Sequence, residues 1–121
     1  MVLVIDDEQA LREVLTEILE IADISTICAG SGEEGAALFL EHQDEIQAIF
    51  LDLNLPGMGG YATFQALRKL NSTIPIIIIS GQPEYVTMAQ FDGQEHLSYL
   101  EKPFTLDVLM AKVNKILDAS S

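Results

Sequence analysis

The sequence predicts a doubly wound α/β domain, a (βα)5 chain folded around a five-stranded parallel sheet. Short apolar runs alternate along the chain with segments of helical period. The runs are apolar on both sides, as strands covered by helices on both faces usually are. At 121 residues and 49% hydrophobic content the chain has the size of one domain, so we expect a single domain over residues 1–121.

Five short runs rich in apolar residues are the predicted strands. We expect them at residues 2–5 (VLVI), 25–29 (STICA), 48–51 (AIFL), 76–79 (IIII) and 97–100 (LSYL). A helix is expected after each strand, because parallel neighbours need a crossover connection. The chain therefore divides into five strand-helix units.

Three of the expected helices carry clear signals. The first has apolar residues at helical spacing, at positions 11, 14, 15, 18 and 19. The second opens with Ser31 and Glu34 at the spacing of a capping box. The last follows Thr105, its expected cap, and its apolar positions are 106, 109, 110, 113, 116 and 117. Each pattern predicts that one helix face packs on the sheet.

The charge of the chain argues against several functions. It has 6 basic and 19 acidic residues and a formal net charge of -13, which opposes binding to nucleic acid or to an anionic membrane surface. No apolar stretch reaches the roughly 20 residues needed to cross a bilayer, and the opening MVLVI runs into acids instead of a cleavage site. We expect a cytoplasmic domain, either free or as the cytoplasmic part of a membrane-bound protein, that contacts neither nucleic acid nor membrane.

Polar residues that follow the predicted strands form a candidate site. Asp6 and Asp7 follow the first strand, Asp52 the third and Ser80 the fourth, and Lys102 comes shortly after the fifth. In doubly wound sheets, ligands bind at the carboxyl ends of the strands where strand order reverses. Three carboxylates gathered there repel one another, so a cation should offset them. The all-oxygen donor set favours Mg²⁺.

The order and spacing of these residues resemble those of a known family. The sequence is similar to receiver domains of two-component response regulators over essentially its whole length, on five motifs: DD at 6 and 7, LDLNLPGMGG from 51, SG at 80 and 81, Tyr99, and KPF at 102 to 104. The resemblance implies a flavodoxin-like three-layer sandwich and Mg²⁺ as cofactor. It implies a histidine kinase or a histidine phosphotransfer domain as partner in a phosphorelay.

The same resemblance assigns roles around Asp52, which would be the phosphoacceptor and attack a partner's phosphohistidine. Asp7, Asp52 and the backbone carbonyl of Asn54 would hold Mg²⁺, with Asp6 acting through a metal-bound water. Lys102 and Ser80 would contact the phosphoryl group. An ionised carboxylate needs no general base for this attack.

A second group of residues would report or tune the reaction. By the resemblance, Ser80 and Tyr99 form a switch that reshapes the face built by the fourth helix, the fifth strand and the fifth helix. The same face is where we expect any homodimer to form. Pro103 is a candidate for a cis peptide bond. Asn54 and Gln82 should lie at the pocket rim, where they would affect the phosphoryl lifetime.

Each site residue also has an ordinary structural explanation. Acids after a strand commonly form turns or begin helices, and serine followed by glycine is a common turn. These explanations would have to coincide at one sheet edge, so we favour the functional interpretation. Outside the pattern, Cys28 is expected to be a buried structural thiol, and His42 and His96 to be surface residues.

Two other functions remain as alternatives. A haloacid-dehalogenase-like Mg²⁺ phosphatase also uses an aspartate nucleophile, but it carries a second acid two residues later, where this chain has Asn54. A phosphorylation-independent pseudo-receiver, a pure binding module, would be expected to lack some of the site residues. We therefore expect a self-phosphorylating and autodephosphorylating receiver and not a turnover enzyme.

The chain departs from the receiver pattern at two places. Glu95 and His96 replace a common Gly-Ala pair before Tyr99, so the fourth helix should end early or be irregular. Gly59 stands where an acid is common, which should affect loop flexibility more than chemistry. Three stretches, LREVLTEILE, FLEHQDEIQAIFLDL and the approach to YLEKPF, look most like receivers at the C-termini of hybrid histidine kinases. We favour that parent over a stand-alone receiver or another regulator.

Overall fold

Strands and helices alternate along the whole described chain. The computed structural model describes residues 1–120 and the side chains of residues 1–116. The elements are β1 (Val2–Ile5), α1 (Gln9–Ile21), β2 (Thr26–Ala29), α2 (Gly32–His42), β3 (Ala48–Asp52), α3 (Gly60–Leu70), β4 (Ile76–Ser80), α4 (Glu84–Gln90), β5 (Leu97–Glu101) and α5 (Leu106–Ser120). The expected domain end at residue 121 and the expected apolar side chain at 117 lie outside the described residues.

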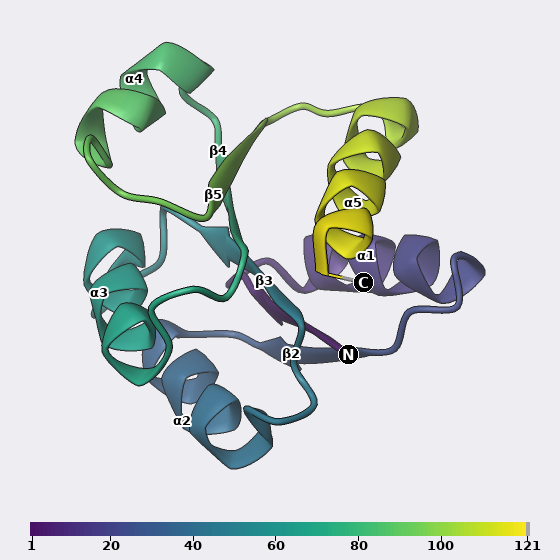
Figure 1. Ribbon diagram of the computed structural model, residues 1–121. Coiled ribbons are helices and arrows are strands. Elements are labelled where there is room, and N and C mark those ends of the chain that lie inside the picture. The colour runs from purple at the N-terminus through teal and green to yellow at the C-terminus, as the bar shows by residue number, and fades with distance from the viewer. Residues whose placement is uncertain (121) are drawn as a thin grey trace.

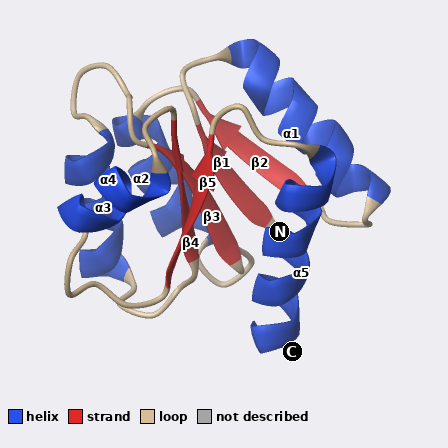
Figure 2. Cartoon of the chain, turned by 90° about the horizontal axis from the view of Figure 1, so that it is seen from above, coloured by secondary structure: helices blue, strands red, loops and turns tan. Residues whose placement is uncertain are grey.

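The five strands form one parallel sheet in the order β2-β1-β3-β4-β5. Figure 1 shows α1 and α5 on one face of this sheet and α2, α3 and α4 on the other. Figure 2, seen from above, shows the strands between these two helical layers. The doubly wound, flavodoxin-like sandwich predicted from the sequence is confirmed.

Two apolar clusters hold the three layers together. On one face, the buried residues of β1, β3 and β4 pack against α1 and α5 through Leu15, Leu19, Leu109 and Val113. On the other face, the alternate residues of the same strands pack against helix residues that include Phe39, Phe64 and Leu67. Successive strand residues point to opposite faces, so covering both faces requires continuous apolar strands.

Two helices begin at the predicted caps. The Ser31 hydroxyl accepts a hydrogen bond from the Glu34 N–H at 3.2 Å, and the Thr105 hydroxyl accepts one from the Val108 N–H at 3.2 Å. In an ideal capping box the Glu34 carboxylate would accept from the Ser31 N–H, whereas here it accepts from the Gly30 N–H, at 2.7 Å. The two side chains thus bind the N–H groups of Gly30 and Glu34 around the start of α2.

The fourth helix is short, in line with the expected early end. It has seven residues, and the loop that follows it contains two residues with positive φ, Gly93 at 82° and His96 at 60°. A side chain at such an angle is disfavoured by contact with its own backbone. This segment therefore connects α4 to β5 through a constrained turn.

Cys28 is more exposed than the sequence predicts, and His42 is less exposed. Cys28 is half-buried because β2 is an edge strand, so the prediction of a buried thiol is wrong. His42 is also half-buried, at the end of α2 beside Glu41 and Glu45, whereas His96 is exposed as predicted. In the described part of the chain, no helix combines the length and hydrophobicity that crossing a bilayer requires.

Candidate functional site

Three aspartates meet at the carboxyl ends of β1 and β3. Asp6 and Asp7 follow β1, and Asp52 is the last residue of β3. One carboxylate oxygen from each lies within 4.8 Å of the other two. The chain leaves β1 toward one face and β3 toward the other, so this is the point where a doubly wound sheet opens a crevice.

Asp6 is the buried member of the cluster. Its side chain is fully buried, and Oδ1 accepts a hydrogen bond from the N–H of Glu8 at 2.8 Å. The pKa of Asp6 is raised to about 6, mainly by burial and also by the charge of Asp52, while the Glu8 N–H and the charge of Lys102 act to lower it. The other oxygen, Oδ2, has no hydrogen-bond partner among the described residues. A buried oxygen in this state is suited to a ligand.

Asp52 is buried at the end of β3 and is fixed by its own loop. Its Oδ1 accepts a hydrogen bond from the Asn54 N–H at 3.1 Å, while Leu53 N–H donates to the Ile79 carbonyl at 2.9 Å. These bonds hold the carboxylate at the rim of the sheet. Asp7, in contrast, is exposed and can approach a ligand from the solvent side.

Lys102 places one ammonium group among the carboxylates. Its Nζ lies 3.7 Å from Asp6 Oδ2, 3.8 Å from Asp52 Oδ2 and 3.5 Å from Glu8 Oε1. Burial by itself would lower the pKa of Lys102, but these carboxylates outweigh it, Asp52 most, and the pKa is raised. The Lys102–Pro103 peptide bond is cis, and the Lys102 N–H donates to the Ser80 carbonyl at 2.7 Å.

The predicted switch residues lie on the neighbouring strands β4 and β5, and the predicted rim residues lie in the loops that follow β3 and β4. Ser80 is buried at the end of β4, and its hydroxyl accepts from the Gln82 N–H at 3.0 Å. Gln82 and Asn54 are exposed and line one pocket together with residues of the loop that follows Asp52. Tyr99 is half-buried on β5 outside the carboxylate cluster, and burial raises the pKa of its phenol.

Glycines shape the loop that leaves Asp52. Gly57 and Gly59 have φ of 68° and 83°, which glycine adopts without strain, so an acid at position 59 would be disfavoured in this turn. At Gly60, a Cβ atom would lie 2.5 Å from the backbone of Leu53. The loop can therefore fold back tightly beside the carboxylate only with glycine there.

Sequence reasoning missed two residues that hold the site together. Glu8 binds Lys102 through its side chain and Asp6 through its N–H. Arg12, on the first turn of α1, donates from Nη1 to the Asp6 carbonyl at 2.6 Å. The third acid of the DDE run was the available signal for Glu8. Arg12 carried no signal, because its partner is a backbone oxygen.

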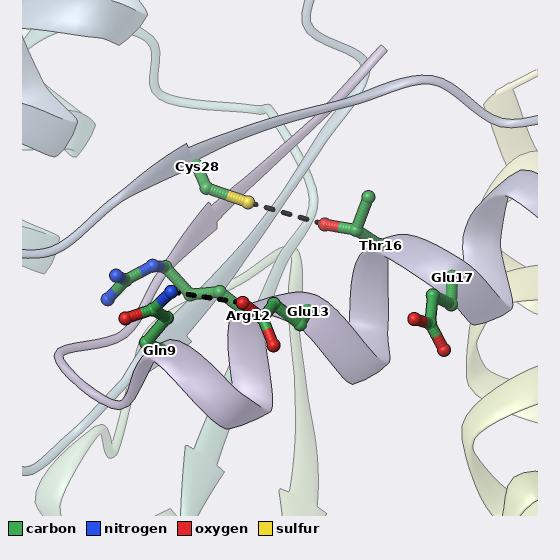
Figure 3. Close-up of a pocket in the computed structure, with 6 residues that line it drawn as sticks. All are labelled: Gln9, Arg12, Glu13, Thr16, Glu17 and Cys28. Carbon is green, nitrogen blue, oxygen red and sulfur yellow. Dashed lines mark hydrogen bonds between the residues drawn. The ribbon is translucent and has the colours of Figure 1, made fainter.

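A separate pocket lies between α1 and the edge strand β2. Figure 3 shows its lining residues, which include Arg12, Thr16 and Cys28. The Thr16 hydroxyl and the Cys28 sulfur are 3.4 Å apart. None of Asp6, Asp7 and Asp52 lines this pocket, so it is separate from the carboxylate cluster.

The carboxylate cluster fits a hard divalent cation. Three carboxylate oxygens lie within 4.8 Å of one another and can serve as metal ligands. Asp6 Oδ2 has no hydrogen-bond partner among the described residues, and Asp7 is exposed, so the cluster can be reached from solvent. Mg²⁺ prefers a few carboxylates and keeps several waters. The donor set therefore agrees with the Mg²⁺ expected from the sequence.

Comparisons with known proteins point to one family. Residues 2–114 match the family described as response regulator receiver domain. The chain is 33% identical over 119 residues to the cell cycle response regulator CtrA of Brucella ovis, covering 98% of this chain and 50% of that protein. It spans about half the length of the curated relatives that it matches first.

Solved structures give the same result. A response regulator receiver domain protein from Clostridium thermocellum is 26% identical, with a TM-score of 0.86, and the match covers 98% of this chain and 94% of that chain. The receiver domain of NtrX from Brucella abortus is 26% identical, with a TM-score of 0.85 and 98% coverage of both chains.

Proposed function

The chain belongs to the response regulator receiver domain family, and from this membership and the site geometry we propose that Asp52 accepts one phosphoryl group in the presence of Mg²⁺. The observation that carries the proposal is the cluster of Asp6, Asp7 and Asp52 with Lys102 beside it. This combination supplies a nucleophile, oxygen ligands for a divalent cation and one fixed positive charge.

The chemistry is a transfer from a phosphohistidine of a histidine kinase or a histidine phosphotransfer domain. An oxygen of Asp52 attacks phosphorus and forms an acyl phosphate, while the P–N bond breaks and its electron pair goes to the imidazole nitrogen, which takes up a proton. Bound Mg²⁺ would neutralise charge on the phosphoryl oxygens. Lys102 binds another phosphoryl oxygen in this proposal, and Ser80 can donate to a third.

The proposal accounts for the return to the starting state. Water attacks phosphorus, the bond from phosphorus to the Asp52 oxygen breaks, and inorganic phosphate leaves. Asn54 stands two residues after the nucleophile and cannot act as a carboxylic acid, which disfavours a haloacid-dehalogenase-like phosphatase. Asn54 and Gln82, at the rim of the pocket, would control how water reaches the acyl phosphate.

Intact-mass analysis after incubation with acetyl phosphate and Mg²⁺ tests the proposal. We expect one added phosphoryl group on the wild type and none on Asp52→Asn. Asp44→Asn is the matched control, because Asp44 is exposed in the loop after α2 and lies outside the cluster. Equal modification of the wild type and Asp52→Asn would refute the assignment of the phosphoacceptor.

Melting curves test the metal separately from the chemistry. Because Asp7 is the exposed ligand and contributes little to the core, Asp7→Ala should fold and lose the response to Mg²⁺. The wild type should gain thermal stability with Mg²⁺ concentration, as any ligand of the folded state produces. Parallel curves for both proteins would contradict Asp7 as a ligand.

The parent protein remains a separate prediction. We propose the C-terminal receiver of a hybrid histidine kinase, on the three sequence stretches that resemble such receivers. The matched curated relatives include regulators of about twice this length, which is the competing arrangement. Sequencing the gene on both sides of this segment decides between them.

A further inference from the structure

The guanidinium of Arg68 binds four backbone carbonyl groups from two loops. Arg68 lies in the last turn of α3 and is half-buried. Its Nη1 donates to the carbonyls of Ile74, at 2.8 Å, and Asn71, at 3.4 Å. Its Nη2 donates to the carbonyls of Glu95 and His96, both at 3.1 Å. One side chain thus joins the end of α3 to the α3–β4 loop and to the α4–β5 loop, an arrangement named here the Arg68 clamp.

The clamp is a built contact and not a solvated surface charge. Arg68 has no carboxylate partner among the described residues, and burial lowers its pKa although the guanidinium stays charged. Its Cζ lies 5.2 Å from the centre of the Phe64 ring, within the range of a cation–π contact. The planar fork of arginine lets one group serve several carbonyls, which a lysine cannot reproduce.

The loop that the clamp holds has a disfavoured backbone conformation. His96 has a φ of 60°, in the left-handed region. Arg68 binds the carbonyls of Glu95 and His96, on both sides of the His96 Cα atom, and the Ile76 N–H also donates to the His96 carbonyl at 3.1 Å. Such a conformation persists where surrounding contacts fix it. The shape of the α4–β5 loop therefore depends on Arg68.

The clamp is continuous with the aromatic residues around Tyr99. The Phe64 ring under the guanidinium meets Phe91 edge-on, with ring centres 5.1 Å apart, and Phe91 lies 6.5 Å from Tyr99. Phe91 is the residue that ends α4. A change at Tyr99 that moves Phe91 or the α4–β5 loop must therefore act against the clamp. Figure 1 shows α3 and α4 on the same side of the sheet.

We infer that Arg68 is a positioning residue that holds the α4–β5 loop in its resting conformation and thereby limits rearrangement of the surface around Tyr99. A contact made in only one of two conformations lowers the population of the other. Loss of the clamp should loosen the loop before any phosphorylation. The consequence for phosphoryl uptake rests on the proposed function, since a looser surface reaches the phosphorylated conformation more easily.

Hydrogen exchange of the unphosphorylated domain tests the clamp. Arg68→Met removes the charged fork, and Arg68→Lys keeps the charge but loses the fork. Lys69→Met is the matched control, because it removes a positive charge from the adjacent, exposed position. We expect exchange over residues 94–99 to be at least fivefold faster in Arg68→Met, intermediate in Arg68→Lys and unchanged in the control. Amides of β1 and β3 serve as the reference for global stability.

The outcomes separate the clamp from the phosphorylation chemistry. The clamp would be overturned if hydrogen exchange of the α4–β5 loop is unchanged in folded Arg68→Met, or if exchange in β1 and β3 accelerates by the same factor. If Arg68→Met does not fold, the same comparison is made with Arg68→Lys. Uptake from acetyl phosphate should be at least twofold faster in the loosened variants, and an unchanged rate would overturn the control of rearrangement. If the wild type takes up no phosphoryl group, the proposed function fails, and the exchange result still decides whether the clamp exists.

Discussion

Replacing Asp6 by asparagine should stabilise the domain near neutral pH in the absence of Mg²⁺. Asp6 is fully buried beside Asp52, and its pKa rises from the ordinary 3.8 to about 6. A carboxyl group with a raised pKa favours the folded state while it is protonated, and this advantage is lost as pH rises from 3.8 toward 6. Asparagine stays neutral and can still accept the hydrogen bond from the Glu8 N–H, so the variant does not lose this stability as pH rises.

The difference between the ordinary pKa of 3.8 and the pKa of about 6 in the folded domain sets the size of the stabilisation. It corresponds to about 3 kcal/mol of unfolding free energy as an upper bound. For a domain of this length, that is roughly 10 °C in melting temperature. The wild type and Asp6→Asn should therefore melt together near pH 4, and the variant should melt higher by up to this amount at pH 7.5.

Thermal melts from pH 4 to pH 8 in EDTA measure this difference. Asp44→Asn should follow the wild type at every pH, because Asp44 is exposed and outside the cluster. Saturating Mg²⁺ should shrink the gap, since the ion neutralises the repulsion and binds the wild type better. A constant gap between Asp6→Asn and the wild type across the pH range would refute the reasoning that burial and Asp52 hold Asp6 partly protonated.

Two further changes test the supports of the site. Glu8→Gln removes one of three carboxylates around Lys102, so the rate of phosphoryl uptake from the anionic donor acetyl phosphate should rise about threefold. Intact mass followed over time measures this rate, with Glu20→Gln as the control. Slower uptake would contradict this role of Glu8. Gly60→Ala places a methyl group 2.5 Å from the Leu53 backbone and should cost about 2 kcal/mol in urea unfolding. Gly81→Ala, with no atom within 4 Å, should cost clearly less, and equal losses would contradict the close packing.

The fold was readable from the sequence because its signals are local. The run at 76–79 has no polar residue, so a strand buried on both faces was its natural interpretation, and β4 indeed has five buried residues. Ser31 and Thr105 marked two helix starts through their own side chains. Strand order was less local: the half-buried state of Cys28 follows from β2 lying at the sheet edge, which the residues around Cys28 do not encode.

The site was readable where side chains carry the chemistry and unreadable where backbone does. Asp6 and Asp7 follow β1, Asp52 ends β3 and Lys102 follows β5, and the parallel sheet brings them together as expected. The Arg68 clamp binds carbonyl oxygens, which every residue possesses, so no residue type at positions 95 and 96 could have predicted it. The irregular segment before Tyr99 was visible in the sequence only as a departure from the receiver pattern.

The charges of the site imply that cation and phosphoryl donor bind together. With Asp6 ionised, the site holds four carboxylates, those of Asp6, Asp7, Asp52 and Glu8, and one ammonium, which leaves three net negative charges in a partly buried crevice. A phosphoryl group brings more negative charge and would meet repulsion of several kcal/mol at an effective dielectric constant of about 20. Protonation of Asp6 relieves one charge only below about pH 6, so at neutral pH a divalent cation has to offset the rest. The cation binds an ionised carboxylate better than a protonated one, so half-maximal phosphoryl uptake should need more Mg²⁺ at pH 6 than at pH 8, and a requirement independent of pH would contradict this coupling.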